Sequence, residues 1–174
     1  ALNWAISQGA AEMSARFIYS MAWWWGINKY AGEGYQFAER VLAFSDAISS
    51  ALRGMMLRRI GRLVFLHGRY EHARGLLEES VALLRESDEQ VELARALNQL
   101  SKLANNPDYA QESLEIFTGL DNKRGLAWVL NTLGEQARLA EDHEAALGYY
   151  EQSLTLYEAF KYHIMLASVY ANLG

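Results

Sequence analysis

Apolar residues recur at steps of three and four along most of the chain, which is the pattern of amphipathic helices. One clear stripe runs through Ala73, Leu76, Leu77, Val81 and Leu84. Short polar or glycine-containing segments separate the stripes, so that successive helices are joined by brief turns. The pattern therefore predicts pairs of antiparallel helices.

A large apolar residue followed by a small residue recurs at nearly regular intervals. The pairs are Ile60-Gly61, Leu100-Ser101, Leu133-Gly134 and Leu173-Gly174, and their spacing is 40, 33 and 40 residues. Ala73 and Ala146 recur in the same way in the segments between these pairs. Helices packed about 8–10 Å apart need small side chains where their backbones approach most closely. Because glycine inside a helix costs about 1 kcal/mol relative to alanine, its return at one register marks a packing face.

The repeat predicts an all-α fold, an α-solenoid of antiparallel helix pairs that stack on one another. Its middle unit is shortened by seven residues. The predicted units are a divergent N-terminal helical repeat at 1–47, a repeat at 48–87, the shortened repeat at 88–120, a repeat at 121–160, and the first helix of a truncated repeat at 161–174.

The residues Leu133-Gly134, Ala146 and Tyr150, with two helices in each unit, resemble the tetratricopeptide repeat (TPR) in a longer form of about 40 residues. The resemblance covers residues 46–174. It implies a right-handed solenoid that binds a protein or peptide. The chain departs from the family pattern in lacking a proline after the second helix and in carrying Ser101 in place of glycine.

The N-terminal part carries a second resemblance, which rests on Ala1 to Gly9, on Trp23-Trp24-Trp25 and on Gly32-Glu33-Gly34. This stretch is similar to the junction that follows the nucleotide-binding module in bacterial multidomain signal-transduction ATPases, of the LuxR-type and antibiotic-regulator type. The resemblance implies a cytoplasmic interaction module, acting as sensor or scaffold, within a larger bacterial regulator of transcription. Nucleotide binding and DNA binding would then belong to other domains.

Composition narrows the function classes. The 174 residues include no cysteine and a single proline, which excludes disulfides and thiolate metal sites and favours long helices. The net charge of −5 argues against direct nucleic-acid binding. The longest nearly apolar run, Phe17 to Ile27, spans about 16 Å as a helix, whereas a bilayer core needs about 30 Å. We expect no membrane span, and the chain reads as a fragment because it begins without Met and stops inside a helical pattern.

No catalytic, cofactor or metal motif stands out. Gly32-Glu33-Gly34 lacks the third glycine of a dinucleotide fingerprint and is interpreted as a turn between helices. His143-Glu144 begins like a zinc-protease helix, but Leu147 occupies the place of the second histidine ligand. We therefore predict no enzyme activity, no cofactor and no metal.

A binding groove is predicted from the register of the first helices, which line the concave side of such a stack. The exposed positions lie six and three residues before, and one and four residues after, each small residue. They are Met55, Arg58, Arg62, Phe65, Arg95, Asn98, Lys102, Asn105, Trp128, Asn131, Glu135 and Arg138. Five are basic and one is acidic, so the groove is predicted to be basic although the chain is acidic.

Similarity to the peptide-clamping members of the repeat family implies an acidic peptide ligand for Arg58, Arg62, Asn98, Lys102 and Asn131, although their Lys and Asn arrangement is only partly reproduced. The alternative is that these are exposed polar residues without a ligand.

Two further surfaces are predicted. Trp23, Trp24 and Trp25 sweep about 200° of a helix, so at least one of them should be incompletely buried, and Trp23 and Trp24 are the candidates for an interface. A C-terminal repeat without a capping helix would expose apolar surface. The competing function is therefore a structural element that self-associates and has no peptide ligand.

Overall fold

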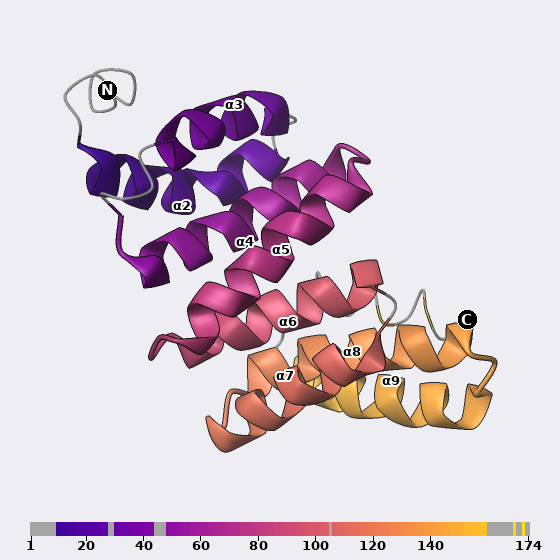
Figure 1. Ribbon diagram of the computed structural model, residues 1–174. Coiled ribbons are helices and arrows are strands. Elements are labelled where there is room, and N and C mark those ends of the chain that lie inside the picture. Colours follow the sequence, from indigo (N-terminus) through magenta and orange to yellow (C-terminus); the bar gives the residue numbers. More distant parts are fainter. Residues whose placement is uncertain are drawn as a thin grey trace. The chain divides into compact units, whose positions relative to one another are not determined.

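The computed structural model describes residues 10–27, 30–43, 48–104, 106–159, 169 and 172. All regular secondary structure in these residues is helical, which confirms the predicted all-α class (Figure 1). The helices are α2 (Ala11–Ile27), α3 (Ala31–Leu42), α4 (Ser50–Leu66), α5 (Tyr70–Arg85), α6 (Gln90–Ala104), α7 (Pro107–Gly119), α8 (Lys123–Leu139) and α9 (His143–Ala159). The chain forms two compact units, residues 1–96 and 97–174, and the division falls within α6.

Each of the ranges 48–87, 88–120 and 121–160 contains one pair of helices, and the range 1–47 contains α2 and α3. Of residues 161–174, only Val169 and Asn172 are described. The first helix predicted for a truncated repeat in that range, and the surface it would leave uncapped, therefore lie outside the described residues.

In the N-terminal unit α2 packs on α3 and α4, α3 packs on α4, and α4 packs on α5. Trp25 of α2 is buried and stacks on Phe37 of α3, with ring centroids 6.1 Å apart. Gly34 lets α3 approach this indole, because a Cβ atom at Gly34 would lie 2.6 Å from a Trp25 ring carbon. Gly32 and Gly34 thus belong to the first turn of α3, and the interpretation of this stretch as a turn between helices was wrong.

In the C-terminal unit α8 packs on both α7 and α9. A Cβ atom at Gly134 would lie 2.6 Å from a ring carbon of Tyr150, which is buried in α9. At Gly61, the matching position of α4, a Cβ atom would lie 3.0 Å from Leu77. The predicted role of these two glycines as points of close helix approach is confirmed.

A buried hydrogen bond ties the second helix of a pair to the first in both units. The Ser80 hydroxyl donates to the Gly54 carbonyl over 2.7 Å, and the Ser153 hydroxyl donates to the Ala127 carbonyl over the same distance. Both serines are fully buried. The two helix pairs therefore repeat a polar contact as well as an apolar one.

Three turns between helices share one geometry. The second residue after the end of α4, α7 and α8 has a left-handed backbone: Gly68 at φ 74°, Asp121 at φ 46° and Glu141 at φ 63°. The next amide then donates to a carbonyl five residues back, from Arg69 to Val64, from Asn122 to Phe117 and from Asp142 to Ala137. These bonds satisfy carbonyls at the helix ends in the manner of a Schellman turn. Only one of the three positions carries the glycine that this geometry favours.

Candidate functional site

A buried ion pair joins α4 to α6 in the N-terminal unit. The Arg58 Nε of α4 donates to Glu92 Oε2 of α6 over 2.7 Å, and both side chains are at most 5% exposed. Arg95 donates to the other carboxylate oxygen over 2.6 Å, and the Tyr19 hydroxyl of α2 donates to it over 3.2 Å. Three donors from three helices therefore satisfy one carboxylate.

The charges of this group perturb one another. Burial alone would raise the pKa of Glu92, but Arg58 and Arg95 outweigh it and hold the pKa below its ordinary value. Burial lowers the pKa of Arg58 to about 10, with Glu92 acting against the shift and Arg59 adding to it. The guanidinium remains charged at neutral pH. The protein tolerates the buried charge of Arg58 because the Glu92 carboxylate pairs with it.

Two further arginines extend this group along α4. The Arg59 guanidinium lies over the Tyr19 ring, 4.6 Å from its centroid. The surrounding protein partly desolvates the Arg62 guanidinium, and Arg59 lies nearby, so that both effects lower the pKa of Arg62. We name Arg58, Arg59, Arg62 and Arg95 the arginine cluster. Glu92 is the carboxylate that pairs with its members in the described part of the unit.

The predicted groove residues include Arg58, Arg62 and Arg95 of this cluster but not Arg59. Glu92 and Tyr19, which contact the cluster, were not predicted either. The exposure predicted for Arg58 is wrong: the side chain is 3% exposed, because it lies against Glu92 of α6. Glu92 falls nine residues before Ser101, outside the register positions used for the groove. Its spacing of three from Arg95 is the one local signal of a pair. Arg62 and Arg95 do reach the surface.

In the C-terminal unit the predicted groove residues form a paired polar group. Lys102 Nζ lies 2.8 Å from Glu135 Oε2, and the Asn131 side chain donates to the other Glu135 oxygen over 3.2 Å. Asn172 donates to Asn131 over 3.2 Å. The lysine charge is therefore compensated, and the excess of positive charge predicted for the groove is concentrated in the N-terminal unit.

Several predicted groove residues differ from the expected exposure or lie outside the described residues. Asn98 is fully buried and Asn131 is 4% exposed, so the exposure predicted for both is wrong. The Asn98 amide has no hydrogen-bond partner among the described residues. Trp128 is half-buried and Arg138 is exposed on α8. Asn105 lies outside the described residues, and the role of all these side chains in binding a ligand stays a prediction.

The three tryptophans of α2 were predicted to include at least one that is incompletely buried. Trp25 is buried, whereas Trp24 is 41% exposed and stacks on Tyr30, with ring centroids 5.6 Å apart and planes within 8°. The prediction of an incompletely buried tryptophan is confirmed for Trp24. The side chain of Trp23 lies outside the described residues.

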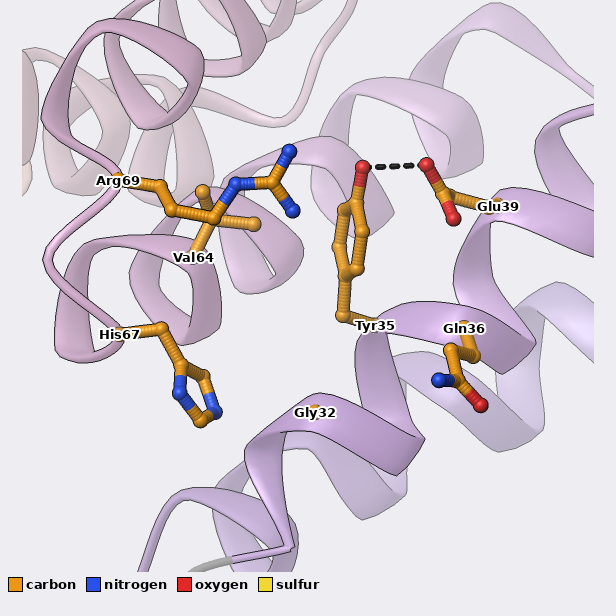
Figure 2. Close-up of a pocket in the computed structure, with 7 residues that line it drawn as sticks. All are labelled: Gly32, Tyr35, Gln36, Glu39, Val64, His67 and Arg69. Carbon is orange, nitrogen blue, oxygen red and sulfur yellow. Dashed lines mark hydrogen bonds between the residues drawn. The ribbon is translucent and has the colours of Figure 1, made fainter.

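A separate pocket of about 410 Å³ opens in the N-terminal unit (Figure 2). Three segments line it: α3, the end of α4, and the turn that leads into α5. The lining residues are Gly32, Tyr35, Gln36, Glu39, Val64, His67 and Arg69. No sequence pattern marked this pocket, because its residues come from segments that only the packing of α3 on α4 brings together.

Tyr35 stands at the centre of this pocket. Its hydroxyl donates to Glu39 Oε1, its ring faces the Arg69 guanidinium at 5.2 Å, and its edge meets the His72 ring at 5.4 Å. Burial raises the pKa of Tyr35, and Glu39 adds to this shift while Arg69 opposes it. In Figure 2, Arg69 and Glu39 lie on opposite sides of the phenol. The pocket thus has a cationic side and an anionic side.

Among the described residues, no three histidine, aspartate or glutamate side chains come together in a way that would hold a metal ion. None of the helices in the described part is long and apolar enough to cross a bilayer.

Comparison with known proteins bears on the fold. Residues 90–159 match the tetratricopeptide repeat family. No curated protein matches the chain. The crystal structure of BtubC (BKLC) from P. vanneervenii is similar with a TM-score of 0.72 and 17% identity, over 100% of this chain and 85% of that one. A Podosopora anserina chain with nearly identical TPR-like repeats shows a TM-score of 0.49 and 16% identity, over 90% of this chain and 92% of that chain.

At this level of identity the BtubC structure shows a shared fold alone. The resemblance of the N-terminal part to a regulator junction stays a prediction. Tetratricopeptide repeats generally mediate protein–protein interaction. The family match and the shared fold therefore identify residues 90–159 as a tetratricopeptide repeat region within an all-α, tetratricopeptide-like fold.

Proposed function

We propose that the chain is a non-catalytic module that binds an acidic segment of a protein or peptide through the arginine cluster. The observation that carries this proposal is the excess of positive charge in the cluster, where Glu92 pairs with Arg58 and Arg95 while Arg59 and Arg62 add two further positive charges. The tetratricopeptide repeat region at 90–159 supports a protein or peptide as the class of partner.

The charge balance favours an anionic partner for a physical reason. Glu92 already accepts from Arg58, Arg95 and Tyr19, so it has little capacity left for another cation. Arg62 has no hydrogen bond or ion pair with another side chain in the described part of the chain, and Arg59 lies close enough to lower its pKa. A partner carboxylate beside Arg62 would relieve this repulsion and gain charge-assisted hydrogen bonds.

The test compares two peptides of equal length, one rich in Asp and Glu and one rich in Ser and Gln, by fluorescence anisotropy. We expect the acidic peptide to bind, and its affinity to fall between about 0.05 M and about 0.3 M salt. Arg62→Gln should weaken binding at least about 5-fold, because a hydrogen bond to a charged group is lost.

Arg74→Gln is the matched control, since Arg74 is exposed on α5, pairs with Glu78 and lies outside the cluster. It removes the same charge and should leave the affinity unchanged. Equal binding of the two peptides, or an equal effect of Arg62→Gln and Arg74→Gln, would overturn the proposal.

We further propose that the module serves a larger bacterial regulator in the cytoplasm and passes the binding event to attached domains. What supports this is the resemblance of the N-terminal part, around Trp23-Trp24-Trp25, to the regulator junction. A ligand that prefers one arrangement of the helices would shift the population of that state and so the activity of an attached domain. The flanking gene sequence tests it: without an upstream phosphate-binding loop and a terminal helix-turn-helix, the regulator proposal falls.

One observation favours the competing function, a structural element that self-associates. Trp24 and Tyr30 form a stacked aromatic pair with 41% and 48% of their surfaces exposed. Exposed aromatic side chains are enriched at protein interfaces. Sedimentation of the chain and of its Trp24→Ser variant separates the two functions. A dimer that dissociates in the variant supports self-association, and a monomer in both cases opposes it.

A further inference from the structure

The pocket around Tyr35 is distinct from the arginine cluster. None of its lining residues belongs to that cluster. Its volume of about 410 Å³ falls within the range of about 300–1,000 Å³ that is usual for small-ligand sites. It exceeds the space that one water molecule needs by about an order of magnitude.

One side of this pocket presents cationic and hydrogen-bond-donating groups. Arg69 and His67 both belong to the turn between α4 and α5, and Figure 2 shows their side chains on the same side of the pocket. Both residues are exposed, and no carboxylate pairs with either of them in the described part of the chain. The planar fork of donors that an arginine guanidinium presents matches the geometry of a carboxylate.

Tyr35 and Val64 supply surface for the body of a ligand. The Tyr35 side chain is half-buried, and Val64, which also lines the pocket, is buried. Gly32 leaves room in the pocket, since a Cβ atom there would meet only His67 Nε2, at 3.9 Å. A flat or apolar group fits against such a ring and valine.

Glu39, the one carboxylate among the lining residues, does not make this pocket a cation site. Glu39 Oε1 already accepts the Tyr35 hydroxyl, and the Arg69 guanidinium lies over the same ring, where it would repel a bound cation. The hydrogen bond to Tyr35 also holds Glu39 on the side of the phenol away from Arg69 (Figure 2).

We propose that this pocket binds a small organic carboxylate, with its carboxylate group held by Arg69 and His67 and its flat or apolar body against Tyr35 and Val64. The carboxylate belongs either to a free small molecule or to the C-terminal residue of a partner chain, because both present the same chemistry to Arg69.

The test titrates the full chain with benzoate and with benzamide, which has the same shape and no charge, and follows the amide resonances of Gly32 and Arg69 by NMR. We expect benzoate to shift both resonances and to bind at least about 10-fold more tightly than benzamide. Arg69→Gln should weaken benzoate at least about 10-fold, the loss expected for a charged hydrogen bond. Gly32→Leu should abolish binding, because the new side chain would fill the pocket.

Arg74→Gln again serves as the control of equal charge, and circular dichroism checks that each variant is folded. A peptide that ends in a free phenylalanine carboxylate, compared with its C-terminal amide, separates the two sources. If the free acid displaces benzoate and the amide does not, the ligand is a chain end; if neither does, it is a free small molecule. Equal binding of benzoate and benzamide, or benzoate binding that survives both Arg69→Gln and Gly32→Leu, would overturn the proposal.

Discussion

Replacing Gly134 by alanine tests whether the small residues of the repeat exist for packing. Gly134 lies inside α8, where alanine would ordinarily be preferred by about 1 kcal/mol. The Cβ atom that the substitution adds would lie 2.6, 2.7 and 3.0 Å from three ring carbons of Tyr150. Carbon atoms in van der Waals contact are about 3.5–4.0 Å apart, so the ring would have to move by about 1 Å.

The Tyr150 ring has little freedom to make that movement, because it is 2% exposed and belongs to the core cluster of the C-terminal unit. Overpacking in such a place costs about 1–3 kcal/mol. After the gain in helix propensity, we expect Gly134→Ala to lower the free energy of unfolding by up to about 2 kcal/mol.

Gly148→Ala is the matched control, because Gly148 lies inside α9 of the same unit and a Cβ atom there would meet nothing within 4 Å. This substitution should raise the free energy of unfolding by about 0.5–1 kcal/mol. Urea unfolding followed by circular dichroism measures both. If Gly134→Ala stabilises the protein as Gly148→Ala does, the packing argument is refuted.

A double-mutant cycle assigns the cost to the ring. In a Tyr150→Leu background the aromatic carbons next to Gly134 are absent, so Gly134→Ala should cost less than in the natural sequence. A coupling energy of about 0.5–3 kcal/mol is usual for residues in contact. A coupling near zero would place the strain elsewhere.

Three further substitutions have clear expected effects. Glu141→Gly should stabilise the turn before α9 by about 0.5–1 kcal/mol, because Glu141 has φ 63° and glycine adopts it without strain; a lower urea midpoint would contradict this. Asn122→Ala should cost about 1 kcal/mol, because its side chain accepts from the Gly125 amide at the start of α8, and a neutral effect in urea unfolding would remove the capping role. Glu92→Gln should cost about 3 kcal/mol at neutral pH, since it leaves the buried Arg58 without a charged partner. The pKa of Glu92 is lowered in the folded state, so its contribution is present above the unfolded value of about 4.3 and is lost as the pH falls below it. Glu92→Gln should flatten that acid dependence in urea titrations across pH, and an unchanged pH profile would count against the ion pair.

The sequence by itself determined the class and the repeat of this protein. Helical periodicity predicted the pairs of helices, and the recurrence of Gly61 and Gly134 predicted two points of close helix approach, which the structure places against Leu77 and Tyr150. Both signals are local, because a helix places every third or fourth side chain on one face whatever it packs against. They were reliable for that reason.

Only the tertiary structure decided what the polar residues do. Periodicity placed Arg58 on an exposed face, but α6 brings Glu92 against it and buries both charges. The same kind of pairing joins Lys102 to Glu135, 33 residues away. The pocket at Tyr35 forms where α3 packs near the turn after α4. The sequence of neither segment predicts that the two lie together. The charge and shape of a site depend on contacts between segments that are distant in the sequence. Periodicity within one helix predicts which face is buried, but not which residues of another helix pack against it.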